Sequence, residues 1–411
     1  MTLTETEAAE IALLRDPATV RARAHALLAL GEQDGLPHFR VHPDKLEAAA
    51  DLVAATIRSN YPTLDIPYHA RWRHFAAGGV DRWGALAATM ADVPAAEVAR
   101  RRFDLCVVSV LLDAGAGPDW RYAEPGGAPI GRSEGLAVAS LDAFRAGLFS
   151  GDPAQRLRAD AAGLSRLDPS RLAAAFQVGP GNPLTGVEGR AALLHGLGEA
   201  LRARPDLFGA DARIGGLYDH LAAQAVGGAL PATAILAAVL EGLGPIWPAR
   251  LRLHGVNLGD VWRHRLAAPE GPAPGLVPFH KLSQWLSYSL VEALEDSGLA
   301  VTDLDALTGL PEYRNGGLFL DTGVLVPRDP GLPAELLHVD SEAVVEWRAL
   351  TVALLDRVAD LVRARLGKTA AEMPLARVLE GGTWAAGRRI AAEKRPGGAP
   401  PLQVVSDGTV F

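Results

Sequence analysis

Two polar clusters in the C-terminal part of this 411-residue sequence contain side chains that hydrophobic packing does not require. The first begins near residue 278, and its members recur at steps of three and four, on one face of a predicted helix: Lys281, Gln284, Trp285 and Tyr288. Aromatic rings of this kind can pack on a sugar, and Lys281 can bind an anionic group. The alternative is an amphipathic helix whose apolar side chains enter the core while Lys281 is solvated.

The second cluster combines Glu312, Tyr313 and Arg314, and Asp321 follows it. A carboxylate such as that of Glu312 can stabilise developing positive charge or orient water, and Arg314 can hold an anion. The alternative interpretation is structural. It is a short helix that Thr308 caps and that the Asn-Gly-Gly after Arg314 ends.

Helices must position these clusters, because helical periodicity dominates the chain. Apolar residues follow helical spacing in four stretches: residues 43–57, 94–112, 185–201 and 341–367. Asp92 is the predicted cap of the second stretch, and Thr185 with Glu188 forms a predicted capping box at the start of the third. The fourth is the longest, from Ser341 to a stop at Gly367.

Strand signals are few. Residues 402–411, with Asp407-Gly408 as a turn, and residues 318–327 are candidates. Loops are predicted where Pro and Gly gather, in residues 115–129, 179–183, 269–278 and 396–401. We therefore expect a mainly α-helical protein with few short strands, divided at residue 268 into parts 1–268 and 269–411 that pack as one unit.

Composition limits the class of protein. Apolar residues make up 49% of the chain and are regularly interrupted by charged residues and glycine, which is typical of a helical globular protein. The net charge of −8 argues against nucleic-acid binding, since backbone phosphates require a basic surface. No stretch approaches the roughly 20 apolar residues of a membrane span. The acidic N-terminus does not resemble a signal peptide, so we expect a soluble cytoplasmic protein.

Familiar cofactor and metal motifs are absent from the sequence. No dinucleotide fingerprint, phosphate-binding loop or H-E-x-x-H helix occurs. His69 and His74 are five residues apart, a spacing that does not favour one helical face, so we predict no metal site there. Cys106 lies in an apolar run and is interpreted as a buried small hydrophobic residue. Asp113 and Asp119 flank a glycine-containing loop and are weaker candidates for binding substrate hydroxyls.

Residues 278–286 (P-F-H-K-L-S-Q-W-L) and 307–317 (L-T-G-L-P-E-Y-R-N-G-G) resemble the uracil-catabolism proteins of the URC pathway in fungi and bacteria. Residues 113–120 (D-A-G-A-G-P-D-W) and 131–136 (G-R-S-E-G-L) extend the resemblance over most of the chain. The resemblance implies a role in opening uracil nucleotides into ureido-ribose compounds and releasing urea.

A second resemblance is to queuosine-salvage nucleosidases, which have a helical fold related to DNA glycosylases. Their segments F-Y-K-R-A-Q and A-D-Y-R-V-P-Q are similar in order and separation to residues 279–284 and 311–317. In this comparison Lys281 aligns with their lysine, and Glu312 aligns with their catalytic aspartate. Here the acid is one methylene longer, and Asn-Gly-Gly replaces V-P-Q. This resemblance implies a DNA-glycosylase-like helical core.

Together these features predict an N-glycoside hydrolase that releases urea from a ribosylurea-type intermediate, with Glu312 as the catalytic carboxylate and Asp321 in reserve. The candidate substrate-binding residues are Lys281, Arg314, Tyr313, Trp285, Tyr288, Arg132, Asp113 and Asp119. We expect a nucleoside- or nucleotide-derived small molecule as the partner, and no cofactor. Two alternatives stay open: a hydrolase of the ureido carbon–nitrogen bond, perhaps metal-assisted, and a non-catalytic nucleotide-binding scaffold.

Overall fold

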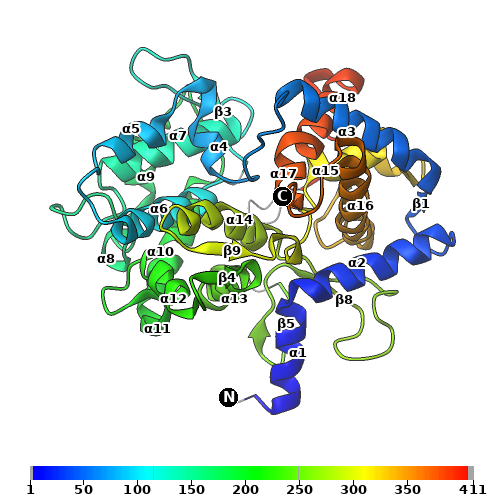
Figure 1. The fold of residues 1–411 in the computed structure, drawn as a ribbon, viewed down its shortest axis with the longest axis horizontal. Helices are drawn as coiled ribbons and strands as arrows, with labels where there is room; N and C mark the ends of the chain where they lie inside the picture. Colours follow the sequence, from blue (N-terminus) through cyan, green and yellow to red (C-terminus); the bar gives the residue numbers. More distant parts are fainter. Residues whose placement is uncertain (1–2, 114, 249, 406–411) are drawn as a thin grey trace. The chain divides into compact units, whose positions relative to one another are not determined.

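The computed structural model describes residues 3–113, 115–248 and 250–405, and it confirms a mainly α-helical protein with short strands (Figure 1). The chain divides into two units. Unit 1 contains Met1–His69, Ala249–Gln284 and Asp303–Phe411, and unit 2 contains Ala70–Pro248 and Trp285–Thr302. Among the described residues, no helix is both long enough and apolar enough to cross a membrane.

Unit 1 is built from the two ends of the chain and one middle segment. Its helices are α1 (Glu5–Arg15), α2 (Pro17–Glu32), α3 (Leu46–Asn60), the start of α14 (Lys281–Glu295), α15 (Tyr313–Asp321), α16 (Glu342–Leu366), α17 (Leu375–Val378), the π-helix η6 (Leu379–Thr383) and α18 (Trp384–Lys394). Its strands are β1 (Phe39–Val41), β5 (Arg252–Leu253), β6 (Val256–Asn257), β7 (Val261–Arg263), β8 (Leu276–Pro278), β10 (Leu325–Pro327), β11 (Leu336–Leu337) and β12 (Gln403–Val404).

Unit 2 is also mostly helical. Its helices are α4 (Trp72–Phe75), α5 (Arg82–Ala88), α6 (Ala95–Leu111), α7 (Arg132–Arg145), α8 (Ala161–Leu164), α9 (Pro169–Ala175), α10 (Val187–Ala203), α11 (Pro205–Phe208), α12 (Gly216–Gln224), α13 (Ala232–Leu243) and the later part of α14. Its strands are β2 (Arg121–Tyr122), β3 (Ile130–Gly131), β4 (Ala229–Pro231) and β9 (Ala300–Thr302).

The strands of each unit pair only two by two among the described residues. The pairs β1–β10, β2–β3, β5–β6 and β7–β8 are antiparallel, whereas β4–β9 and β11–β12 are parallel. Pairs this short cannot supply a core of their own, so the helices supply it.

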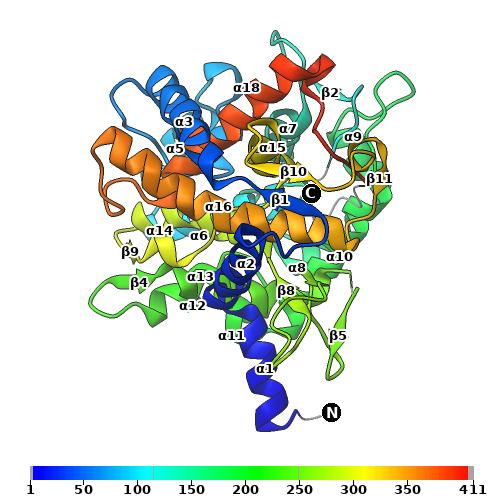
Figure 2. The same ribbon diagram turned by 90° about the vertical axis from the view of Figure 1, so that its right-hand side faces the viewer.

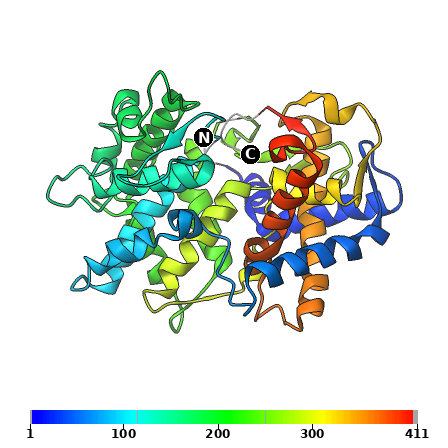
Figure 3. The same cartoon turned by 90° about the horizontal axis from the view of Figure 1, so that it is seen from above.

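Two predicted helices are confirmed closely. In α3 the residues at helical spacing are all buried: Leu46, Ala49, Val53 and Ile57. In α16, Ser341 is the N-cap and Gly367 ends the helix in a left-handed conformation with φ of 64°. Apolar faces of α2 and α3 pack on α16, which places α16 in the core of unit 1 (Figure 3).

Two predicted helix caps are wrong, although α6 begins near Pro94 as predicted. The N-cap of α6 is Pro94 rather than Asp92, because the helix begins only at Ala95. The predicted capping box before α10 does not form. Gly186 takes the N-cap position in a left-handed conformation, and this displaces Thr185 by one residue.

The interpretation of residues 318–327 as an extended segment is wrong in its first part, because α15 continues to Asp321 and only β10 is extended. Residues 403–404 of the predicted C-terminal strand form β12, and the predicted Asp407-Gly408 turn lies outside the described residues. The two units also differ from a division at residue 268, since the segment from 249 to 284 belongs to unit 1. That division stays a prediction of the sequence.

Candidate active site

Glu312 caps the N-terminus of α15 in unit 1. Its side chain accepts hydrogen bonds from the backbone N–H groups of Arg314, at 2.7 Å, and of Asn315. Thr308 is therefore not the cap, contrary to the structural alternative. Glutamate is not among the preferred N-cap residues, and Glu312 is only 8% exposed, so helix capping alone does not account for this residue type.

The electrostatic setting of Glu312 combines burial with positive charge. Burial raises the pKa of the Glu312 carboxyl, and the N–H groups of Arg314 and Asn315 oppose that rise. The charges of Lys281 and His69 also lower the pKa of Glu312. A poorly solvated carboxylate beside cationic groups is the arrangement expected of a catalytic acid or base.

Two glycines allow close packing around the start of α15. A Cβ atom on Gly316 would lie 2.7 Å from the ring of Trp347, whose Nε1 donates to the Gly316 carbonyl at 3.1 Å. A Cβ atom on Gly387 of α18 would lie 2.1 Å from the carbonyl oxygen of Arg314. Figure 2 shows α15 and α18 packed together. The Asn-Gly-Gly after Arg314 therefore continues the helix and does not end it.

Lys281 is the first residue of α14, in the part of that helix that belongs to unit 1. Its backbone N–H donates to the Asp260 carboxylate at 2.9 Å. One turn later, buried Gln284 accepts from the backbone N–H of Thr308 at 2.7 Å and donates to the Thr308 hydroxyl at 2.6 Å. These bonds tie the start of α14 to the segment that leads into α15, so the two predicted clusters are held together.

A histidine–glutamate pair in unit 1 was not among the predicted site residues. His69 Nδ1 lies 2.8 Å from Glu380 Oε2, and both side chains are mostly buried. Glu380 stands in the π-helix η6 between α17 and α18. π-helices are rare and recur at functional sites. The charge of His69 lowers the pKa of Glu312, so His69 acts electrostatically on that carboxylate.

Tyr313 and Arg314, the other predicted residues at the start of α15, follow Glu312 in the sequence. Their contacts differ from those of Glu312. Arg314 Nη1 donates to the Gly398 carbonyl at 2.8 Å. The Arg314 guanidinium lies 4.8 Å from the centre of the Tyr313 ring, and Tyr313 is 37% exposed. Tyr313 is thus exposed to solvent, while Arg314 also has a structural role.

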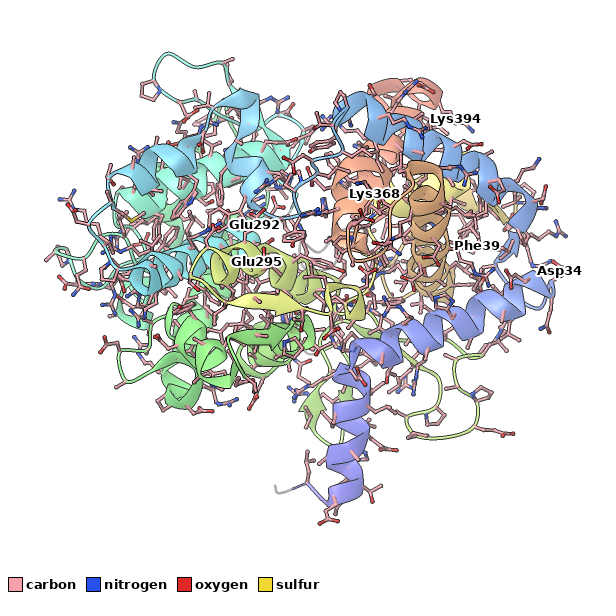
Figure 4. All side chains as sticks on the ribbon, in the orientation of Figure 1. Asp34, Phe39, Glu292, Glu295, Lys368 and Lys394 are labelled. Atoms are coloured by element: carbon pink, nitrogen blue, oxygen red, sulfur yellow. The ribbon has the colours of Figure 1, made fainter. Side chains whose placement is uncertain are left out.

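Asp321 occupies the opposite end of α15. Its carboxylate pairs with Arg395 through contacts of 2.7 and 2.5 Å, and its carbonyl oxygen accepts from Lys394, labelled in Figure 4. At 1.5 Å per residue, Asp321 is about 13 Å along the helix axis from Glu312. The structure therefore does not bring the reserve carboxylate to Glu312.

The remaining predicted residues belong to unit 2. Trp285 and Tyr288, on the later part of α14, are buried, as the amphipathic-helix alternative expected. Asp119 and Arg132 are exposed. Asp113 is mostly buried and pairs with a buried arginine described below. Lys281, Glu312 and Arg314 thus lie together in unit 1. The five remaining candidates lie in unit 2.

Cys106 is fully buried, as predicted, and burial raises the pKa of its thiol to about 12. His69 belongs to unit 1, whereas His74 belongs to unit 2. Within the described ranges, no three His, Cys, Asp or Glu side chains are grouped so that they could hold a metal ion.

Comparison with known proteins identifies the class of this chain. The family described as a protein of unknown function, DUF1688, matches residues 13–411, and the chain belongs to that family. It is 41% identical to Protein urg3 of Schizosaccharomyces pombe, over 95% of this chain and 96% of the relative. It is 38% identical to Uracil catabolism protein 4 of Lachancea kluyveri, over 91% of this chain and 92% of the relative.

Proposed function

We propose that this protein is an N-glycoside hydrolase of uracil catabolism. Its substrate is a ribosylurea-type intermediate, with or without a 5′-phosphate, and its products are urea and a ribose compound. The name of the Lachancea relative supports the pathway, and the resemblance of residues 279–284 and 311–317 to nucleosidases supports the reaction and a DNA-glycosylase-like core. We place the reaction in the cytoplasm.

The observation that carries this proposal is the buried carboxylate of Glu312. When the bond between ribose C1 and the urea nitrogen breaks, both electrons leave with nitrogen and positive charge develops on the sugar. A carboxylate stabilises that charge most where water is scarce, because the effective dielectric constant is lower there. The oxygen of a water molecule then bonds to C1 and loses its proton to a base.

The leaving nitrogen needs a proton, and His69 is the candidate donor. Glu380 contacts Nδ1 of the ring and so fixes its orientation, as carboxylates do for catalytic histidines. The cations near Glu312 have a separate role. Lys281 and Arg314 are the candidates to hold a 5′-phosphate.

The test is to incubate the purified protein with ribosylurea and with its 5′-phosphate, and to follow the products by mass spectrometry. Release of urea with a free sugar supports the proposal. Release of ammonia and carbon dioxide instead, with loss of activity on chelation, would identify a metal-assisted hydrolase of the ureido bond. Binding of either compound without turnover would identify a scaffold and overturn the catalytic proposal.

A further inference from the structure

Arg71 of unit 2 is fully buried, and only part of its guanidinium has partners. Nε donates to the Ser109 hydroxyl at 2.8 Å, and Nη1 lies 2.9 Å from Asp113 Oδ1 and 3.1 Å from His74 Nδ1. Nη2 is buried and has no hydrogen-bond partner among the residues that the structure describes. Buried donors in native proteins are nearly always paired, so we expect Arg71 Nη2 to have a hydrogen-bond acceptor.

The same guanidinium lies against the first turn of α7. Nη1 is 3.2 Å from the Ser133 carbonyl oxygen and 3.1 Å from its hydroxyl. The N-cap residue of α7, Gly131, makes no side-chain capping bond. Since α7 has 14 residues, its N-terminus carries the partial positive charge and the N–H groups that bind anions.

The charges around Arg71 favour a negative ligand. Asp113 is held by the Ser133 hydroxyl, which lies within 2.6 Å of both carboxylate oxygens. Burial lowers the pKa of a second guanidinium, Arg190, to about 10, and the charge of Asp113 opposes that change. Two guanidiniums thus act on one carboxylate, and these three groups keep one positive charge, while the first turn of α7 also carries the acidic side chain of Glu134.

Part of this cluster is exposed to solvent. Arg71 is fully buried, while Asp113, Ser133 and His74 keep part of their surface in solvent. Trp285 packs beside the cluster, since its ring centre is 5.8 Å from the Arg71 guanidinium and 5.8 Å from the His74 ring.

We propose that this cluster of unit 2 binds the oxyanion of a small acid, a carboxylate or a phosphate, through Arg71 Nη2 and the first turn of α7. Asp113 orients the guanidinium through Nη1, so that Nη2 is left to the ligand. This binding site belongs to unit 2 and does not depend on the proposed glycosidase activity.

Isothermal titration calorimetry tests the site. The full chain is titrated at constant ionic strength with orthophosphate in one series and with acetate in another, which separates the two sources of the oxyanion. We expect saturable binding of at least one of them. Arg71→Lys keeps the charge but loses the planar fork, so its affinity should fall about tenfold or more. Arg102→Lys is the matched control, because Arg102 is also buried in unit 2 and lies 4.3 Å from the Trp72 ring.

A second measurement uses the unaltered protein, in case Arg71→Lys does not fold. Crystals soaked in selenate should show an anomalous peak within hydrogen-bonding distance of Arg71 Nη2. The proposal is overturned if the unaltered protein binds neither anion in solution, or if Arg71→Lys binds as well as the unaltered protein. A selenate peak without binding in solution also overturns it, as an adventitious ion only.

Discussion

His69 Nδ1 and Glu380 Oε2 lie 2.8 Å apart, although the two residues are separated by 311 positions in the chain. The backbone N–H of His69 also donates to the Ala376 carbonyl at 3.0 Å, so the backbone and the ring are held by the same helical stretch. A histidine whose backbone and ring are both held in place loses little conformational freedom when a substrate binds. Such preorganisation favours proton transfer.

The pair itself can be tested with Glu380→Gln. An amide at this position no longer stabilises a protonated His69 ring, so we expect kcat on ribosylurea to fall by about 10 to 100-fold. The control is Glu342→Gln, because Glu342 lies 3.2 Å from His38 in a comparable pair of the same unit. Equal kcat in both variants would assign His69 and Glu380 a structural role.

Glu312→Gln tests the catalytic carboxylate. Loss of the negative charge should lower turnover at least about a hundredfold, while ligand binding persists. The weakened cap should cost only about 1 kcal/mol of unfolding free energy, measured with urea. Asp168→Asn is the control, since Asp168 caps α9 by accepting from the Arg171 backbone N–H at 2.8 Å. Normal turnover in Glu312→Gln would remove Glu312 from the mechanism.

The pH dependence of kcat/KM reports the ionisation of Glu312. Burial raises the pKa of Glu312 above its ordinary value of 4.5, so the carboxylate predominates only at a higher pH than for an exposed glutamate. We expect kcat/KM to decrease as the pH falls through that raised pKa. A rate that stays constant down to pH 4.5 would contradict an ionised Glu312 as the active form.

Gly387→Ala tests how tightly α18 fixes the start of α15. The added Cβ would meet the Arg314 carbonyl oxygen at 2.1 Å, so the backbone must shift. We expect a loss of about 1–3 kcal/mol in urea unfolding, together with lower turnover. Gly196→Ala in α10 is the matched control, because no described atom outside its own stretch of helix lies within 4 Å of its added Cβ. That variant should be neutral or more stable by up to about 1 kcal/mol.

Local chemistry made α3 and α16 predictable. Ser341 and Gly367 act on their own helix, and the buried stripe of α3 requires only one apolar surface to pack against. The sequence also singled out Lys281 and Glu312, through resemblance and residue type. Their roles in catalysis stay predictions.

Long-range packing accounts for what the sequence did not predict. The sequence predicts that Gly316 ends a helix, but the ring of Trp347, 31 residues away, requires a glycine at this position. No periodicity links His69 to Glu380. Gly381 and Gly382, two glycines within a helical run, are a local signal of irregular helix geometry at this place.

The order of the segments in unit 1 has a consequence for synthesis. The ribosome makes α2 and α3 early, yet the helix that buries their apolar faces, α16, begins only at Glu342. Unit 2 is translated almost entirely in between. The apolar faces of α2 and α3 therefore remain without their partner helix until nearly all of the chain has been made, so the core of unit 1 can be completed only late in synthesis.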